Sequence, residues 1–475
     1  MDKTRNRLSF ILVGGAACIT AFAPAIGQQT PAARGATGTG SGLSVTLDYL
    51  TTLRYDDNLA LRKSSLGSTS RWENRLGLGV VSQTPDSLLT FNLSGLHRFS
   101  DSPIIGSDSE FNEPRVRLAY SRNSANSQIA GQAEYRETDL TFNQSLTDIN
   151  QDGVIDAADI IIDPGTRVTT RAGVTWQVGI NDPLGFVLSY NHSKREFRGT
   201  TDPNLFDSQS DRYSLATLLR ISPVLQGNVT LSYIDYSAND AALTDRQTTT
   251  LSTGITYNVS PVTTINASIG VSQVDETLRA IPSNTVDEGF VASFSWAKTL
   301  ANGAANFVVD QTFGTNGDRT NVQAGRSYVL PRGTFDFSFG VTQGPFGKTT
   351  PIGSLNYTHK LPSSQFTAAL QRRVSTSTQS VETQQTQASL GYDYFINSVS
   401  SASLGVNYLE QANDGTGPSN RRQRANLNAS YTHALTKDWD MTVGYQHRFA
   451  NDPAPGSASG NSIFVSLGRQ FVLKP

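Results

Sequence analysis

Long apolar runs, cysteine and an excess of either charge are all scarce in this sequence. After residue 30, no apolar run reaches the length of about 20 residues that a membrane-spanning helix needs. Cys18 is the only cysteine, which leaves almost no room for thiol chemistry or disulfides. The formal net charge is −2, so no basic excess is present to attract nucleic acid. Helical membrane proteins, disulfide scaffolds and nucleic-acid binders are therefore not indicated.

Regularly spaced apolar and aromatic residues are what the chain does contain, set among 40 glycines and many Ser, Thr, Asn and Gln. A disordered chain would lack this regular supply of Phe, Tyr, Val and Leu. The length of 475 residues is compatible with about three domains. One repeated pattern nevertheless covers residues 42–473, which favours a single large β-domain.

The N-terminus has the layout of an export signal. Lys3, Arg5 and Arg7 provide the positive charge. An apolar core follows at 8–23, and small residues precede Gln28, where cleavage is expected. We therefore interpret residues 1–27 as a signal peptide, whose removal takes Cys18 with it, and residues 28–41 as a flexible periplasmic arm. An uncleaved anchor helix is the alternative.

From residue 42 onward the chain repeats segments of about ten residues in which apolar and polar side chains alternate, a period typical of β-strands. In one such segment Leu76, Leu78 and Val80 share a face. The same alternation recurs at Leu89/Phe91/Leu93, Val116/Leu118/Tyr120, Val174/Trp176/Val178, Phe186/Leu188/Tyr190, Val229/Leu231/Tyr233, Ile265/Ala267/Ile269, Phe335/Phe337/Phe339, Leu404/Val406/Tyr408 and Met441/Val443/Tyr445. Each segment is followed by a turn, so the chain reads as a series of hairpins.

The connections between these segments alternate in length. Short turns carry Pro, Asn, Asp, Gly or Ser, residues that favour turn conformations. The long connections are expected at 56–70, 100–110, 139–165, 198–209, 237–245, 276–284, 314–320, 411–421 and 450–461. This alternation is typical of a transmembrane β-barrel with short periplasmic turns and long extracellular loops, and the segments number about 22, within a range of 20–22 strands.

In each segment, the positions between the apolar residues form a second, polar face, which we call the polar parity. The charged residues on this face distinguish a barrel from a soluble sandwich or solenoid. Facing inward would be Arg115, Arg117, Arg167, Arg171, Arg212, Arg220, Asp336, Asp393, Asp440 and Arg448. A water-filled lumen accepts such groups, whereas a dry protein core does not. Lipid on the outside requires every backbone group to be bonded within the sheet. The sequence therefore predicts an all-β fold, a closed antiparallel transmembrane β-barrel spanning residues 42–473.

The end of the chain carries a short motif of its own. Ser466, Gly468, Phe471 and Leu473 have the spacing polar-x-Gly-x-x-hydrophobe-x-hydrophobe. This resembles the C-terminal insertion signal of bacterial outer-membrane barrels, although Arg469 departs from it on the apolar parity. The resemblance implies recognition of Ser466–Leu473 by the barrel-assembly machinery. Outer-membrane lipid and lipopolysaccharide would then be the surroundings of the folded barrel.

A second resemblance lies at the end of the first segment. Tyr55, Asp56 and Asn58 stand in the stretch Leu53-Arg-Tyr-Asp-Asp-Asn-Leu59, and hairpins follow it directly. This is similar to the β-barrel porin family, including the outer-membrane barrels encoded with exopolysaccharide systems. The resemblance implies a Gram-negative outer-membrane protein with a role in polysaccharide export or outer-membrane passage, and it brings no catalytic residues. From the residues alone, a solvated turn is the favoured interpretation of positions 56–58.

Arginines on the polar parity form the first candidate site. They are Arg115, Arg117, Arg136, Arg167, Arg171, Arg212 and Arg220, and Glu134 is the main acid among them. Arginine presents a fork of donors suited to carboxylate or phosphate. We expect a basic wall in the lumen that guides anionic solutes or acidic polysaccharide. The alternative is that these arginines pair with inward acids and hold the shape of the barrel.

A calcium loop is the second candidate site. Its ligands would be Asp148, Asn150, Asp152, Val154 through its carbonyl, Asp156 and Asp159. The spacing matches a 12-residue EF-hand loop in its dockerin-like form, with Gly153 at the sharp turn. Ca²⁺ is therefore a candidate cofactor. An acidic, solvated outer loop is the alternative.

The width of such a barrel raises the question of what occupies it, since 22-stranded transporters are plugged. No plug precedes residue 42, so a TonB-type transporter is not expected, and loops 56–70 and 139–165 are expected to fold inward. An enzyme is not expected either. His192 and Ser193 are adjacent in sequence, but strand neighbours point to opposite faces. A surface adhesin or structural barrel remains an alternative to the channel.

Overall fold

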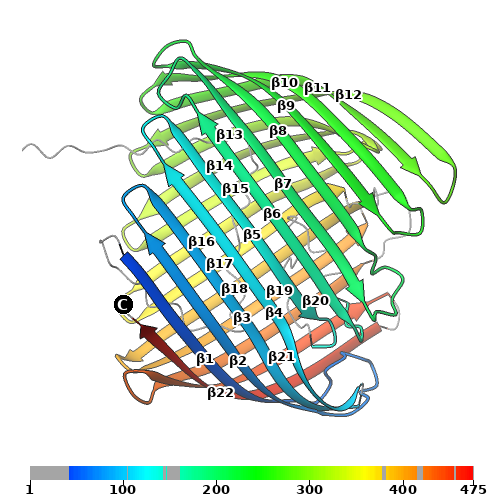
Figure 1. The fold of residues 1–475 in the computed structure, drawn as a ribbon, viewed down its shortest axis with the longest axis vertical. Coiled ribbons are helices and arrows are strands. Elements are labelled where there is room, and N and C mark those ends of the chain that lie inside the picture. Colours follow the sequence, from blue (N-terminus) through cyan, green and yellow to red (C-terminus); the bar gives the residue numbers. More distant parts are fainter. Residues whose placement is uncertain are drawn as a thin grey trace, which may run out of the picture.

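The alternating segments of the sequence form 22 strands in one antiparallel sheet (Figure 1). This computed structural model describes residues 42–103, 105–142, 146, 161–376, 381–413, 421–453 and 456–473. The strands are β1 (Gly42–Asp56), β2 (Thr69–Gln83), β3 (Ser87–Ser102), β4 (Gly106–Asn123), β5 (Ser127–Asp139), β6 (Thr166–Val178), β7 (Leu184–Arg198), β8 (Ser208–Arg220), β9 (Leu225–Ala238), β10 (Thr244–Ser260), β11 (Thr263–Leu278), β12 (Ser283–Leu300), β13 (Gly303–Gly314), β14 (Gly317–Leu330), β15 (Gly333–Gln343), β16 (Thr349–Leu361), β17 (Ser364–Thr376), β18 (Glu382–Asn397), β19 (Ser400–Asn413), β20 (Arg422–Ala434), β21 (Trp439–Asp452) and β22 (Gly456–Leu473). The signal peptide and arm expected at 1–27 and 28–41 lie outside the described residues.

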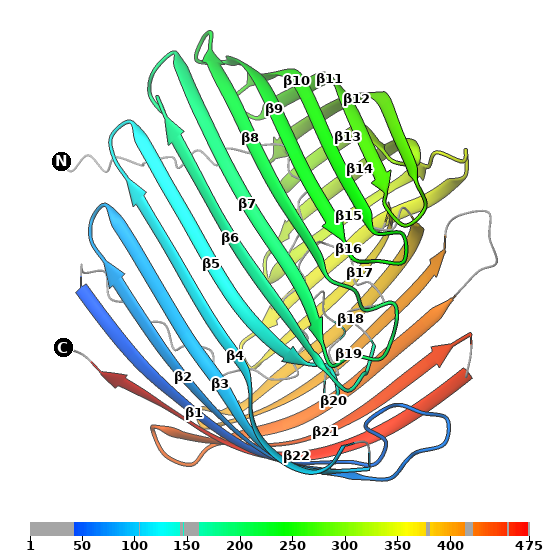
Figure 2. The same ribbon diagram turned by 45° about the vertical axis from the view of Figure 1, so that its right-hand side comes forward.

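The sheet closes because the last strand pairs with the first. Each strand pairs antiparallel with its neighbours in sequence, and β22 pairs with β1 from Val45↔Leu473 to Asp56↔Ser462. Figures 1 and 2 show β22 lying beside β1, with β2 and β3 following along the wall. The predicted closed antiparallel barrel of about 22 strands is therefore confirmed. Among the described residues, no helix is long and apolar enough to cross a membrane.

The two faces of the wall differ as the alternation requires. Residues directly opposite each other on antiparallel strands share a face. Leu53 lies opposite Trp72 and Val465, and Trp72 lies opposite Phe99. All four side chains are exposed, as are the large apolar residues on the same parity of other strands, so this face is the outer, lipid-facing one.

Following the register around the barrel places the opposite parity on the lumen side. The ten charged residues predicted to face inward all share this parity, including Arg115 on β4, Asp393 on β18 and Arg448 on β21. They stand among Ser, Thr, Asn and Gln, which bond across strands, as Thr52 does with Ser466 at 2.9 Å. The water-filled interior inferred from the sequence is consistent with this polar lining.

Connection lengths follow the predicted alternation only in part. Long connections separate β1 from β2, β5 from β6, β7 from β8 and β19 from β20. Long connections were also expected at 100–110, 237–245, 276–284, 314–320 and 450–461, and this was wrong. β3 runs to Ser102 and β4 begins at Gly106, and β13 ends at Gly314 just before β14 begins at Gly317. In these hairpins the polar residues that were expected to form loops belong to the strands. Backbone hydrogen bonds between strands do not depend on contact with lipid, so pairing continues beyond the apolar segment.

Candidate functional site in the barrel lumen

The seven arginines predicted as a basic wall lie on β4, β5, β6 and β8 and all face the lumen. Direct pairs in the register are Arg115↔Arg136, Arg117↔Glu134 and Glu134↔Arg171, which places them in one continuous patch. Such opposite residues have Cβ atoms about 5 Å apart. The wall continues through Asn191 of β7 to Arg212 of β8. The strand register therefore gathers the predicted residues on one arc of the barrel.

Within this arc, the arginines differ in their surroundings. Arg117 and Arg212 are exposed, and neither makes a salt bridge with a carboxylate among the described residues. Arg115 binds Glu134 through Nε at 3.0 Å and a second nitrogen at 2.9 Å. Arg167 is fully buried. Arg117 and Arg212 are thus the arginines of this arc that are best placed to contact a solute in the water of the lumen.

Arg220, the last residue of β8, binds the turn that joins β6 to β7. Its Nη1 donates to the carbonyl oxygens of Gly179 and Asp182, at 2.7 and 2.6 Å. Gly179 has a φ of 67°, a left-handed conformation in which a side chain would be strained. The arginine therefore fixes the short β6–β7 connection at the periplasmic end, which is the shape-holding role considered as the alternative for the whole set.

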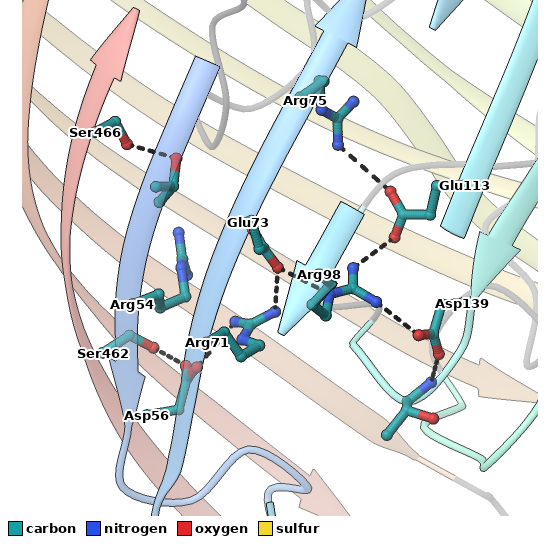
Figure 3. Close-up of polar contacts among 12 residues, drawn as sticks. Arg54, Asp56, Arg71, Glu73, Arg75, Arg98, Glu113, Asp139, Ser462 and Ser466 are labelled. Carbon is teal, nitrogen blue, oxygen red and sulfur yellow. Dashed lines mark hydrogen bonds and ion pairs between the residues drawn. The ribbon is translucent and has the colours of Figure 1, made fainter. Parts of the chain in front are cut away.

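A second, buried cluster of charges lies at the extracellular end of β1 to β5 (Figure 3). Arg71 binds Asp56 at 2.8 Å and Glu73 at 3.1 Å. Arg98 binds Glu73, Glu113 and Asp139, at 3.1, 3.0 and 2.7 Å. Asp56 is fully buried, and Arg71, Glu73 and Arg98 are nearly so. We call Asp56, Arg71, Glu73, Arg98, Glu113 and Asp139 the ion network.

Irregular backbone conformation positions Glu113 and Asp139 of the ion network. Glu113 has a φ of 53° at the point where the β3–β4 register shifts, between Ser94 and Leu96. A bulge of this kind re-aims a side chain, and Glu113 reaches both Arg98 and Arg75. Asp139 ends β5 and accepts from the backbone nitrogen of Thr141 at 2.9 Å.

The β5–β6 connection begins on the inner wall. The ring of Phe142 lies over the guanidinium groups of Arg98 and Arg71, at 4.1 and 5.0 Å from its centroid. Both arginines face the lumen, so residues 139–142 turn inward. Further along, the carboxylate of Asp163 accepts from the backbone nitrogens of Thr201 and Asp202, which ties this connection to the one between β7 and β8. The calcium ligands predicted between these anchors, Asp148 to Asp159, lie outside the described residues.

The segment 56–58 is not a solvated turn, and that interpretation of the sequence was wrong. Asp56 is 0% and Asn58 6% exposed. Ser462 of β22 donates to Asp56, and Arg448 of β21 approaches the same carboxylate at 3.5 Å. Asn58 donates to the carbonyl of Ser459 at 2.9 Å.

Asp57 accepts from the backbone and side-chain nitrogens of Asn461, at 2.6 and 2.7 Å. The two aspartates and the asparagine therefore join the first strand to the last two. We call Asp56, Asp57 and Asn58, with their partners Arg448, Asn461 and Ser462, the seam clasp.

Sequence reasoning missed both of these clusters. Their members are spread from residue 56 to 462, and the strand register brings them together. The available signal was weak: acids and arginines recur on the inward parity at the extracellular strand ends, as Asp56, Arg71, Glu73 and Arg98 do.

Catalytic or metal-binding groupings are sparse in the described part of the chain. No cluster of three or more His, Cys, Asp or Glu suited to a metal is present there. His192 lies 2.8 Å from Asp211 on the outer face, with Ser193 on the other face of the strand. Ser400 lies 2.9 Å from His433, a pair that the sequence did not suggest. The ring nitrogen facing this serine is Nδ1, and Tyr431 also binds the hydroxyl, at 3.2 Å.

Comparisons with known proteins identify a fold and no family. No protein-family model and no curated protein matches the chain. The ferric-catecholate import receptor Fiu from E. coli K12, in its open form, superposes with a TM-score of 0.58 at 11% identity, covering 91% of this chain and 82% of that one. The FrpB iron transporter from Neisseria meningitidis gives 0.60 at 7%, covering 91% and 83%. The copper transporter OprC gives 0.53 at 10%, covering 91% and 80%.

At these identities the likeness concerns the fold alone. The chain shares its fold with outer-membrane β-barrels, and a closed barrel with an apolar outer face belongs in the outer membrane. The predicted localisation is therefore confirmed.

Proposed function

We propose that this protein is an outer-membrane channel that passes anionic solutes along the basic wall of its lumen. The observation that carries the proposal is the exposure of Arg117 and Arg212 on an arc where Glu134 is the main acid. An arginine held in water by a rigid strand can attract an anion and release it again, because its charge is permanent and its site is not enclosed.

The far side of the barrel carries charges of both signs. Asp336, Asp393 and Asp440 face the lumen from β15, β18 and β21, and Arg373, Arg424 and Arg448 face it from β17, β20 and β21. The exposed arginines of β4 to β8 therefore act on a solute as a local excess of positive charge, although the net charge of the chain is only −2. An anion would travel along β4 to β8.

Transport as the general role also agrees with the similar structures, which are those of a ferric-catecholate import receptor, an iron transporter and a copper transporter. Acidic polysaccharide, the substrate implied by the exopolysaccharide barrels, presents repeated carboxylates and would use the same wall. A glycan that co-purifies with the protein would favour polysaccharide export over small anions. We do not propose an enzymatic function, and an adhesin would have no need of selectivity in the lumen.

Reversal potentials in planar bilayers test the proposal. Under a potassium chloride gradient at about 10 mM salt, where the Debye length is about 30 Å, the purified barrel should be anion-selective. Replacing Arg117 and Arg212 together by Gln should move the reversal potential toward the cation-selective side. Lys298→Gln is the matched control, because Lys298 is an exposed cation on the outer face of β12.

Two results would count against the proposal in different ways. A correctly folded barrel without conductance would contradict the channel itself. A conducting barrel whose selectivity is the same before and after the Arg117/Arg212 change would leave the channel standing and remove the guiding role of the basic wall.

A further inference from the structure

Glu134 is the carboxylate on which the basic wall converges. It lies on β5 directly opposite Arg117 of β4 and Arg171 of β6. Arg136 follows two residues later on the same face of β5, and Arg115 lies opposite Arg136. Residues directly opposite each other have Cβ atoms about 5 Å apart, and diagonal neighbours about 7–8 Å. The strand register therefore surrounds one negative charge with four arginines that face the lumen.

Arg115 is the partner of Glu134 within this group. Its Nε and Nη2 both contact Oε1 of Glu134, at 3.0 and 2.9 Å. Arg115 and Arg136 are like charges directly opposite each other, an arrangement that is destabilising by itself. The carboxylate of Glu134 therefore offsets one of these two charges. Its side chain is 15% exposed, so the carboxylate remains in contact with the lumen.

Arg117 and Arg136 carry positive charge that Glu134 does not offset by direct contact. Neither makes a salt bridge with a carboxylate in the part of the chain that the structure describes. They are diagonal neighbours across β4 and β5, so their Cβ atoms are about 7–8 Å apart. Two guanidinium groups at this separation can together bind one sulfate or phosphate, or two carboxylates of one solute. The wall therefore offers a site for a dianion beside Glu134.

We propose that Arg117 and Arg136 bind a dianion in the lumen, and that Glu134 keeps this binding weak enough for the dianion to leave. The proposal rests on the channel function given above, because it concerns the same wall. A channel must bind its solute well enough to admit it and loosely enough to release it. A carboxylate fixed about 5 Å from Arg117 repels the dianion that Arg117 attracts, and it also occupies Arg115.

Two kinds of solute carry such a pair of charges. A small dianion such as sulfate has both charges on one group, and an acidic polysaccharide has a carboxylate on each of two neighbouring sugars. Sulfate and trigalacturonate are therefore the two probes. Either probe supports the site if Glu134 weakens its binding, and the probe that responds more strongly identifies the kind of solute.

Block of the chloride current tests the proposal. In potassium chloride of about 0.1 M, where the Debye length is about 10 Å, each probe is added to one side of a planar bilayer that holds the full-length barrel. Glu134→Gln removes the negative charge and keeps the size of the side chain. It should lower the half-blocking concentration of at least one probe about tenfold and lengthen each blocking event. Adding Arg136→Gln to this variant should return the block to the wild-type level.

Glu276→Gln is the matched control. Glu276 of β11 is a lumen carboxylate outside the basic wall, its side chain is 17% exposed, and Arg246 donates to it through Nε at 2.8 Å. This change should leave the half-blocking concentrations unchanged. A carboxylate that only holds the shape of the barrel would alter stability when it is replaced, but it would not alter the block.

The proposal is overturned if the Glu134→Gln barrel conducts and both probes block it at the same concentrations as the wild type. That result would leave the channel and its anion selectivity standing, whereas a wild-type barrel without conductance would contradict the proposed function itself. If Glu134→Gln does not fold, Arg115→Gln decides. This change leaves the carboxylate of Glu134 unpaired and should raise the half-blocking concentrations, so an unchanged block would again overturn the proposal.

Discussion

At the scale of single residues, the most informative position is Asp56. The sequence suggested a turn exposed to water, yet the carboxylate is fully buried and lies against Arg71, Arg448 and Ser462. A buried charge is tolerated when it is paired and hydrogen-bonded. The partners come from β2, β21 and β22, so this one side chain bonds across the line where the barrel closes.

Replacing this carboxylate should destabilise the barrel. Asp56→Asn keeps the shape but removes the charge that Arg71 and Arg448 face, and breaking a buried ion pair costs about 3–5 kcal/mol. The free energy of unfolding, measured by guanidinium titration in detergent, should fall by about that amount. Asp287→Asn is the control, because Asp287 faces the lumen from β12 and is exposed; its effect should stay within about 0.5 kcal/mol. Equal effects of the two changes would show that Asp56 does not secure the seam.

At the scale of elements, several segments that were expected to be loops form the ends of strands. The β3–β4 and β11–β12 hairpins carry polar residues at their extracellular ends, and backbone pairing continues through them. The connection between β5 and β6 is a true long connection, and it is anchored at both ends. Phe142 holds its start on Arg71 and Arg98, and Asp163 holds its end on Thr201 and Asp202.

Calcium should protect this connection from proteolysis. The sequence between the anchors offers Asp148, Asn150, Asp152, Asp156 and Asp159 as oxygen ligands, and extracellular calcium loops bind with dissociation constants of about 10⁻⁴–10⁻³ M. Limited proteolysis with about 1 mM calcium, compared with chelator, should show slower cleavage within residues 140–163. The variant Asp148→Ala plus Asp152→Ala should be cleaved equally fast in both conditions. Calcium-independent cleavage of the wild type would refute the site.

At the scale of the whole molecule, charge is distributed by position while the total stays near zero. Seven arginines gather on the lumen side of β4 to β8, whereas on β15 to β21 aspartates such as Asp393 and arginines such as Arg424 are mixed. This distribution is not visible in the net charge of the chain.

If the exposed arginines of the basic wall set the selectivity, the selectivity must weaken as the salt concentration rises. The Debye length falls from about 30 Å at 0.01 M to about 3 Å at 1 M, and exposed charges are screened accordingly. We therefore expect the anion selectivity of the wild-type channel to approach zero as salt rises, in reversal potentials taken at a fixed concentration ratio. A selectivity that is unchanged at 1 M would indicate direct binding of the anion at an enclosed site instead of guidance along a wall.

The sequence by itself determined the architecture of this protein. A period of two is a local property of the chain, and lipid on one side with water on the other forces apolar and polar side chains to alternate. Leu78, Trp176, Phe339 and Val443 could therefore be placed outside, and Arg115, Asp393 and Arg448 inside, before any pairing was known. The number of strands and the closing role of the last one also followed from this pattern.

Only the tertiary structure decided which charges meet. Asp56 and Ser462, or Glu73, Arg98 and Asp139, are far apart in sequence, and their contacts depend on register, on the bulge at Glu113 and on closure of the sheet. A strand pattern fixes the face of a side chain but not its neighbour, because each strand can in principle pair in several registers. For this reason the basic wall could be anticipated as a set of inward residues, whereas the ion network and the seam clasp could not.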